Sequence, residues 1–233
     1  MEREGVRDSG KTNRRHEIGR TIRKERRKPA LMRSLPDIAY NFHWVVPGEA
    51  ARSAQAYAGF LAPFLKARDI RAIVNLRGAH PERGWWRYEN RVCEKLGVVQ
   101  LNPKLNSRRL PTRQILIDLI AAFDAAPTPL LIKCSGGQDR SSFASALYIV
   151  HRKGWSAFDE ANAQFAAWPY LHRPKAQQRW LKPFLEFARE AAHGRPLAEW
   201  IASDYTPQSL KAWLEARGLG GAFRGLYDKP GPG

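Results

Sequence analysis

A cysteine and an arginine are separated by five residues within the segment 133–142, which reads KCSGGQDRSS. Glycines in such a turn permit the positive φ angles that direct successive backbone amides toward one centre. The guanidinium of the arginine adds a full positive charge in a geometry that matches two phosphate oxygens. The segment is therefore predicted to bind a phosphate group through Ser135, Gly136, Gly137, Gln138, Asp139 and Arg140.

The cysteine of this segment, Cys134, is a candidate nucleophile. Inward backbone amides and the positive end of a following helix stabilise a thiolate, so we expect a depressed pKa for this thiol. A thiolate can attack phosphorus and form a covalent phosphocysteine intermediate. The hydroxyl of Ser141 could donate to the sulfur and help it leave, or it could serve as an ordinary helix N-cap. Cys134, Arg140 and Ser141 are thus candidate catalytic residues.

A buried strand and a helix are predicted on either side of this segment. Residues 129–133 are a short apolar run, and apolar residues recur at helical spacing from Ser141 onward. Residues 134–140 then form the strand-to-helix turn of an α/β unit. Ligands of open α/β sheets bind at this carboxyl edge of the strands.

The rest of the chain continues the alternation of strands and helices. Together these elements predict an α/β fold, with a central, mostly parallel sheet of four or five strands, flanking helices and a helical C-terminal extension. Further strands are predicted at 42–46, 70–76 and 98–101, and helices at 54–67, at 86–96, around 115–123, at 156–168, at 174–192 with a kink at Pro183, and after an N-cap at Thr206.

The segment 134–141, between its strand and its helix, resembles the phosphate-binding loop of the protein tyrosine phosphatase superfamily. Residues 52–55 (RSAQ) and 75–78 (NLRG) are similar to early segments of bacterial phosphatases related to the dual-specificity group, so the resemblance covers residues 42–190. It implies the cysteine phosphatase fold and hydrolysis of phosphotyrosine or dual-specificity phosphoprotein substrates, with no cofactor and no metal. Rhodanese-type sulfurtransferases and low-molecular-weight phosphatases fit less well, because the former have a shorter loop and the latter an N-terminal cysteine.

Two positions depart from the pattern of this superfamily. The residue before the cysteine is usually histidine, whereas here it is Lys133, whose ammonium could favour a thiolate or point away from the site. Dual-specificity phosphatases also place a general-acid aspartate in the segment that corresponds to residues 102–109, which contain no carboxylate. Asp139 is the best substitute acid, unless it orients Arg140 or caps the helix. Glu82 is a weaker candidate.

Three further arginines are expected at the same edge of the sheet. Arg77, Arg108 and Arg109 follow strand ends, where they could bind a phosphorylated headgroup or a second phosphate. Each could equally be a solvated surface residue. Phosphoinositides are therefore an alternative substrate class, and a catalytically weak phospho-binding module is an alternative function.

The chain is strongly basic, with 39 Lys and Arg against 22 Asp and Glu and a net charge of +17. A field of this sign attracts polyanions. Much of the excess lies in residues 1–34, which contain few apolar residues and are predicted to form a basic disordered arm. This arm is expected either to be a solvated tail or to contact nucleic acid or an anionic membrane surface.

A length of 233 residues predicts one domain with appendages. We expect a phosphatase domain at 35–193 and a helical extension at 194–233 that packs on or trails this domain. The sequence has no signal peptide or transmembrane pattern and only two cysteines, which favours a soluble cytoplasmic protein with reduced thiols. The second cysteine, Cys93, is expected to be a buried small hydrophobe.

Overall fold

The computed structural model describes residues 34–57 and 59–226, so the predicted basic arm lies outside the described residues except for Ser34. A sheet of five strands in the order β1-β2-β5-β3-β4 forms the centre of the fold. β1 runs antiparallel to β2, and all other neighbouring strands are parallel. The predicted α/β architecture is confirmed. The strands are β1 His43–Val46, β2 Ala50–Ser53, β3 Ala72–Asn75, β4 Val99–Leu101 and β5 Leu130–Lys133.

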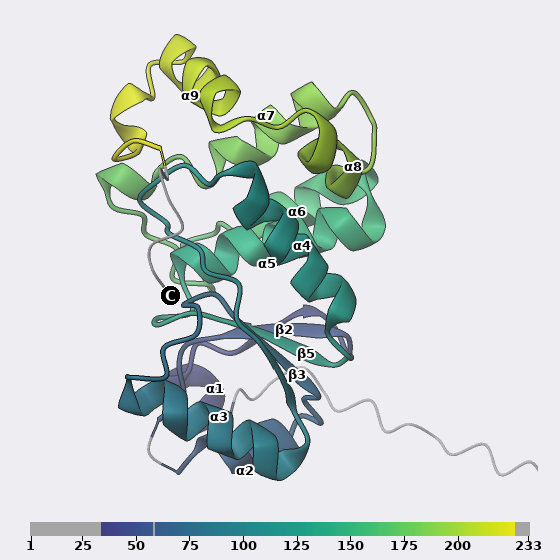
Figure 1. Cartoon of the computed structure of the whole chain (residues 1–233), viewed down its shortest axis with the longest axis vertical. Helices are drawn as coiled ribbons and strands as arrows, with labels where there is room; N and C mark the ends of the chain where they lie inside the picture. The colour runs from purple at the N-terminus through teal and green to yellow at the C-terminus, as the bar shows by residue number, and fades with distance from the viewer. Residues whose placement is uncertain (1–33, 58, 227–233) are drawn as a thin grey trace, which may run out of the picture. The chain divides into compact units, whose positions relative to one another are not determined.

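Helices cover both faces of the sheet. Figure 1 shows α1, α2 and α3 on one face and α4 to α9 on the other. Within the described part of the chain, no helix is long and apolar enough to cross a membrane. The helices are α1 Leu35–Ala39, α2 Leu61–Lys66, α3 Gly84–Leu96, α4 Arg113–Ala125, α5 Asp139–Lys153, α6 Phe158–Ala163, α7 Pro183–Ala192, α8 Leu197–Ser203 and α9 Pro207–Ala216, with 3-10 helices η1 Trp155–Ala157, η2 Ala176–Gln178 and η3 Gly220–Ala222.

β5 is the central strand and is buried along its whole length. Leu130 and Ile132 belong to the apolar cluster with α4 and α5, whereas Leu131 belongs to the cluster with α2 and α3. A strand covered by helices on both faces has this uninterrupted apolar pattern. Because Cys134 directly follows β5, its position is set by a central strand that is buried along its whole length.

The helix predicted over residues 54–67 is reduced to α2. The segment before α2 is a loop whose backbone bonds elsewhere, since the N–H of Gln55 donates to the carbonyl of Ser135 at 3.1 Å. Tyr57 and Phe60 lie within the predicted helix, and their apolar spacing indicates a buried helix face, but they are 47% and 60% exposed. The apolar spacing was therefore misleading at the start of this segment.

Two later helices also differ from the prediction. The helix predicted over 156–168 is limited to η1 and α6. The helix predicted over 174–192 is η2 followed by α7, which begins at Pro183 and is not kinked there. Proline lacks an N–H group and suits the first position of a helix.

The sequence pattern did not reveal α1, β2 or α8, which are too short to show a clear period. As predicted, Thr206 caps α9.

The C-terminal helices pack into the same core as α4 and α5. Trp200 of α8 is 2% exposed, and its ring centroid lies 5.6 Å from that of Phe187 and 6.3 Å from that of Phe184 in α7. The hydroxyl of Tyr205 donates to the carbonyl of Pro111 at 2.7 Å. The buried cluster thus continues across the predicted boundary at residue 193. The division of the chain into arm, domain and extension stays a prediction.

We predict that Trp200→Ala lowers the free energy of unfolding by about 3–5 kcal/mol, because it removes a buried aromatic side chain and leaves a cavity. Denaturant unfolding followed by circular dichroism measures this change. Phe60→Ala is the control: its ring is 60% exposed, so its loss should cost less than about 0.5 kcal/mol. Equal losses for the two variants would show that α8 contributes little to the core.

Candidate active site

The segment singled out in the sequence is the connection between β5 and α5. We call residues 134–140 the phosphate loop. Asp139 is the first residue of α5, two positions before the predicted start at Ser141. Arg140 and Ser141 therefore lie in the first turn of this helix. The first turn of a helix has unpaired N–H groups and a partial positive charge, which together favour anion binding.

Gly137 is the most crowded position of the phosphate loop. Its φ is 62°, and a Cβ atom there would lie 2.5 Å from the backbone nitrogen of Ala54 and 2.6 Å from the carbonyl carbon of Ser53. A Cβ atom at Gly136 would approach only the side chain of Gln138, at 3.7 Å or more. Only the second of the two glycines is therefore required by the fold of the loop.

Buried side chains donate hydrogen bonds to the backbone carbonyl groups of the phosphate loop. Asn41 Nδ2 donates to the carbonyl of Gly137 at 2.9 Å. Arg52 Nη2 donates to the carbonyls of Gly137 and Gln138 at 3.0 and 3.1 Å. The C=O and N–H of a trans peptide point in opposite directions, so these bonds turn the N–H groups of Gln138 and Asp139 away from Arg52. The loop is thereby shaped as a set of amide donors.

Arg52 of β2 is fully buried, and the sequence suggested no role for it beyond a resemblance. The guanidinium also donates to Ser142 Oγ at 2.8 Å and to the carbonyl and side-chain oxygens of Gln164 at 3.1 and 3.2 Å. It lies 4.6 Å from the ring centroid of Tyr170. Burial lowers the pKa of Arg52 to about 10, so the group is still charged at neutral pH. Arg52 follows Ala50 and Ala51 and precedes Ser53, and this local sequence does not indicate that its side chain binds the phosphate loop.

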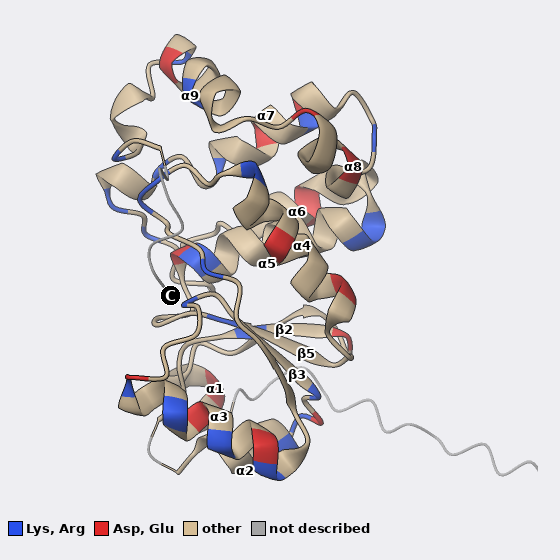
Figure 2. Ribbon diagram, viewed as in Figure 1, with Lys and Arg blue, Asp and Glu red and all other residues tan. Residues whose placement is uncertain are grey.

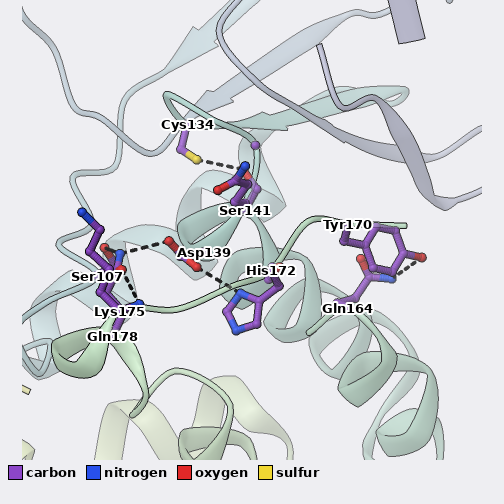
Figure 3. A network of polar contacts seen from close by, with 12 residues as sticks. Ser107, Cys134, Asp139, Ser141, Gln164, Tyr170, His172, Lys175 and Gln178 are labelled. Atoms are coloured by element: carbon purple, nitrogen blue, oxygen red, sulfur yellow. Dashed lines mark hydrogen bonds and ion pairs between the residues drawn. The ribbon is translucent and has the colours of Figure 1, made fainter. Parts of the chain in front are cut away.

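The thiol of Cys134 is 3% exposed and accepts a hydrogen bond from Ser141 Oγ at 3.3 Å (Figure 3). Burial alone would raise the pKa of Cys134. The positive charge of Arg140 and hydrogen bonds from Ser141 and the backbone of Gln138 outweigh burial and lower this pKa below its ordinary value. Gln138 occupies the N-cap position of α5, so the hydroxyl of Ser141 does not cap this helix. It donates its hydrogen bond to the sulfur of Cys134 instead.

Arg140 extends across the phosphate loop. Its Nη2 donates to Ser135 Oγ at 3.1 Å, and its Nη1 donates to the carbonyl of Leu76 at 3.4 Å. Among the described residues no carboxylate forms an ion pair with it. The fork of the guanidinium is thus oriented by neutral acceptors, and its charge is free for an incoming anion.

Asp139 lies in the cavity wall with its carboxylate held by two side chains (Figure 3). Its Oδ2 accepts from Gln178 Nε2 at 3.0 Å, and its Oδ1 lies 3.2 Å from His172 Nδ1. No contact joins its carboxylate to Arg140 among the described residues, which argues against the interpretation that it orients this arginine. Its place in the first turn of α5 suits the partial positive charge there.

The phosphate loop opens into a cavity of about 500 Å³. The three arginines considered in the sequence, Arg77, Arg108 and Arg109, all line it. So do Lys104 and Arg224, which the sequence analysis did not single out. In Figure 2 basic residues gather on the loops beside the start of α5, at the left of the view. With one carboxylate among its lining residues, the cavity is strongly cationic.

Lys133 points away from the cavity, in agreement with one of the two predictions made for it. Its Nζ lies 2.7 Å from a carboxylate oxygen of Glu89 and donates to Gln55 Oε1 at 2.6 Å. The same amide oxygen accepts from Arg77 Nη1 at 3.2 Å, and the guanidinium of Arg77 lies 3.4 Å from the ring centroid of Trp85. These contacts fix Arg77 at the edge of the cavity.

Two other residues considered in the sequence lie outside the cavity. Cys93 is buried in α3, and burial raises its pKa to about 12, so its thiol is protonated at neutral pH. This is the behaviour expected of a small buried hydrophobe. Glu82 contacts His80 at 3.0 Å and is not among the lining residues.

Comparison with solved structures identifies the fold. TpbA from P. aeruginosa matches with a TM-score of 0.53 at 18% identity, over 76% of this chain and 99% of that chain. PTPMT1 matches with 0.47 at 18% over 64% and 98%, and the core catalytic domain of the PP-IP phosphatase SIW14 from S. cerevisiae with 0.45 at 18% over 77% and 93%. No family model and no curated protein matches the chain. The chain has the fold of the cysteine phosphatases, as its resemblance to the superfamily predicted.

We predict that Gly137→Ala weakens the binding of inorganic phosphate by at least about tenfold, because the new Cβ would displace the loop and its amides. Titration calorimetry measures this binding. Gly136→Ala is the matched control, since its Cβ meets only ordinary contacts. If both variants bind phosphate as the native protein does, the phosphate loop is not the anion site.

We predict that the Cys134 thiol is alkylated by iodoacetamide with an apparent pKa below that of an ordinary cysteine, and that Ser141→Ala raises this pKa. The pH dependence of the alkylation rate, followed by mass spectrometry, measures both. Cys93 should stay unmodified in the folded protein. Ser145→Ala is the control, because the hydroxyl of this buried serine of α5 has no hydrogen-bond partner within residues 34–57 and 59–226. The same midpoint in both serine variants would contradict a role for Ser141 at the sulfur.

Proposed function

We propose that this chain is a cysteine-dependent phosphatase that hydrolyses phosphate monoesters through a phosphocysteine intermediate. The observation that supports this best is the Cys134 thiol, whose pKa is lowered and whose sulfur accepts a hydrogen bond from Ser141 at 3.3 Å. It lines a cationic cavity together with Arg140. Such a thiolate is a nucleophile at neutral pH, and the adjacent cation attracts the phosphate that it would attack.

In the proposed reaction Cys134 Sγ forms a bond to phosphorus while the bond from phosphorus to the leaving oxygen breaks. The fork of Arg140 and the amides of the phosphate loop stabilise the charge on the equatorial oxygens. Water then attacks phosphorus, the sulfur departs as a thiolate stabilised by the hydroxyl of Ser141, and inorganic phosphate is released. The positive charge comes from the protein's own groups, so the proposal includes no metal and no cofactor.

We assign Asp139 as the general acid that protonates the leaving oxygen. It is the only carboxylate among the residues that line the cavity in the described chain. Its contacts with Gln178 and His172 hold it at the wall of the cavity. It directly precedes Arg140, the residue proposed to bind the phosphate. A poor leaving group depends on such an acid much more than a good one.

Phosphotyrosine and mixed phosphoproteins are the substrates that the resemblance implies. Phosphoinositides are the second candidate, and the cations Arg77, Arg108 and Arg109 of the cavity favour them because a headgroup carries more than one phosphate. We also retain the proposal that the basic arm contacts an anionic membrane surface or nucleic acid. This arm, apart from Ser34, lies outside the described residues.

We predict that the native protein hydrolyses para-nitrophenyl phosphate in EDTA with reductant present, and that Cys134→Ser abolishes this activity. Asp139→Asn should reduce the hydrolysis of phenyl phosphate, whose leaving group is poorer, by about 100-fold and that of para-nitrophenyl phosphate much less. Steady-state kinetics on both esters measure these effects.

The comparison of the two esters separates chemistry from structure, because a damaged site slows both reactions alike. Equal losses on both esters would exclude Asp139 as the acid. A native protein that does not hydrolyse either ester but binds inorganic phosphate would support the alternative of a phospho-binding module.

A further inference from the structure

A group of cations lines the cavity outside the phosphate loop. Lys104, Arg108 and Arg109 follow β4, and Arg224 comes from the segment after η3. Their side chains form no ion pair with a carboxylate in residues 34–57 and 59–226. Unpaired cations that share one cavity repel each other, and a bound anion relieves this repulsion.

The backbone of the segment 224–226 is fixed along the loop after β4. The N–H of Arg224 donates to the carbonyl of Arg108 at 2.8 Å, and the N–H of Leu110 donates to the carbonyl of Gly225 at 3.1 Å. Leu110 and Leu226 form a parallel bridge, and Leu110 is fully buried. Two stretches of chain that are distant in sequence therefore form one wall of the cavity, with their main chains paired and their basic side chains at its surface.

The same wall is tied to the phosphate loop through Gln178 of η2. Its Nε2 donates to Ser107 Oγ at 2.8 Å and to Asp139 Oδ2 at 3.0 Å (Figure 3). The indole Nε1 of Trp180, which is fully buried, donates to the carbonyl of Ser107 at 2.9 Å. The position of the basic wall relative to the phosphate loop is therefore set by buried contacts.

The charge in the cavity exceeds what a single phosphate group requires. Arg140 and the amides of the phosphate loop already complement one phosphate dianion, and the lining residues include five further cations against one carboxylate. A volume of about 500 Å³ suits a complete small ligand, because such pockets span roughly 300–1,000 Å³. The remaining cations are available to a second anionic group on the same ligand.

We infer that Arg108, Arg109 and Arg224 form a second anion subsite, which binds another phosphate of a substrate that carries at least two. This inference rests on the proposed function and goes beyond it by assigning the second phosphate to a defined subsite and by adding a specificity-determining residue, Arg224. The shared chemistry is a polyphosphorylated headgroup, either free in solution or carried by a lipid.

The test measures binding without turnover, in the Cys134→Ser protein, by titration calorimetry with inorganic phosphate and with inositol trisphosphate. We expect inositol trisphosphate to bind at least about tenfold more tightly than phosphate. Adding Arg224→Gln should weaken the binding of inositol trisphosphate by about tenfold and that of phosphate less than threefold. Arg91→Gln is the matched control, because this exposed arginine of α3 does not line the cavity and its loss removes the same charge.

The outcomes separate this inference from the proposed function. If Arg224→Gln weakens phosphate and inositol trisphosphate equally, or no more than Arg91→Gln does, the second subsite is wrong. If the selective loss is found while the native protein hydrolyses no ester, the subsite stands and the phosphatase activity is wrong. Sedimentation with vesicles that contain phosphatidylinositol bisphosphate identifies the source: a selective loss there alone indicates a lipid headgroup, and a loss with the soluble probe alone indicates a free one.

Discussion

The arrangement of the candidate active site depends on the hydrogen bonds of the buried Arg52 guanidinium. This guanidinium donates hydrogen bonds to the carbonyls of Gly137 and Gln138 and to the hydroxyl of Ser142, and so bonds to both the phosphate loop and the first turn of α5. A buried charge is costly unless its donors are satisfied, and here acceptors surround all but Nε. The loop thus satisfies the buried arginine, and the arginine in turn gives the loop its shape.

This arrangement explains how a cationic site can hold a reactive thiol. The phosphate loop has two sides, one that presents carbonyls to Arg52 and one that presents amides to the sulfur and the cavity. Positive charge therefore lies on both sides of the same short segment. Arg52 is confined to the interior, whereas Arg140 is held by neutral acceptors at the mouth of the loop.

The sequence was informative where the candidate site is formed by residues close together in the chain. Cys134, Gly137 and Arg140 fall within one strand-to-helix connection, so their residue types and spacing were enough to predict the loop and the α/β class. Contacts between distant segments were not predictable. Arg224 lies at the cavity where residues 224–226 pair with the loop after β4, and Gln178 lies there at the end of a 3-10 helix within a segment predicted to be one long helix. No local pattern carries such information.

The pairing of residues 224–226 with the loop after β4 also bears on the order in which the site is completed during synthesis. A chain emerges from the ribosome beginning with its N-terminal part. β1 to β5 and α5 are made well before Arg224, so the phosphate loop and its buried arginine can form while one wall of the cavity is still missing. The wall arrives with the final pairing of Leu110 and Leu226. During biosynthesis, this wall of the cavity can therefore be completed only after residue 226 has been made.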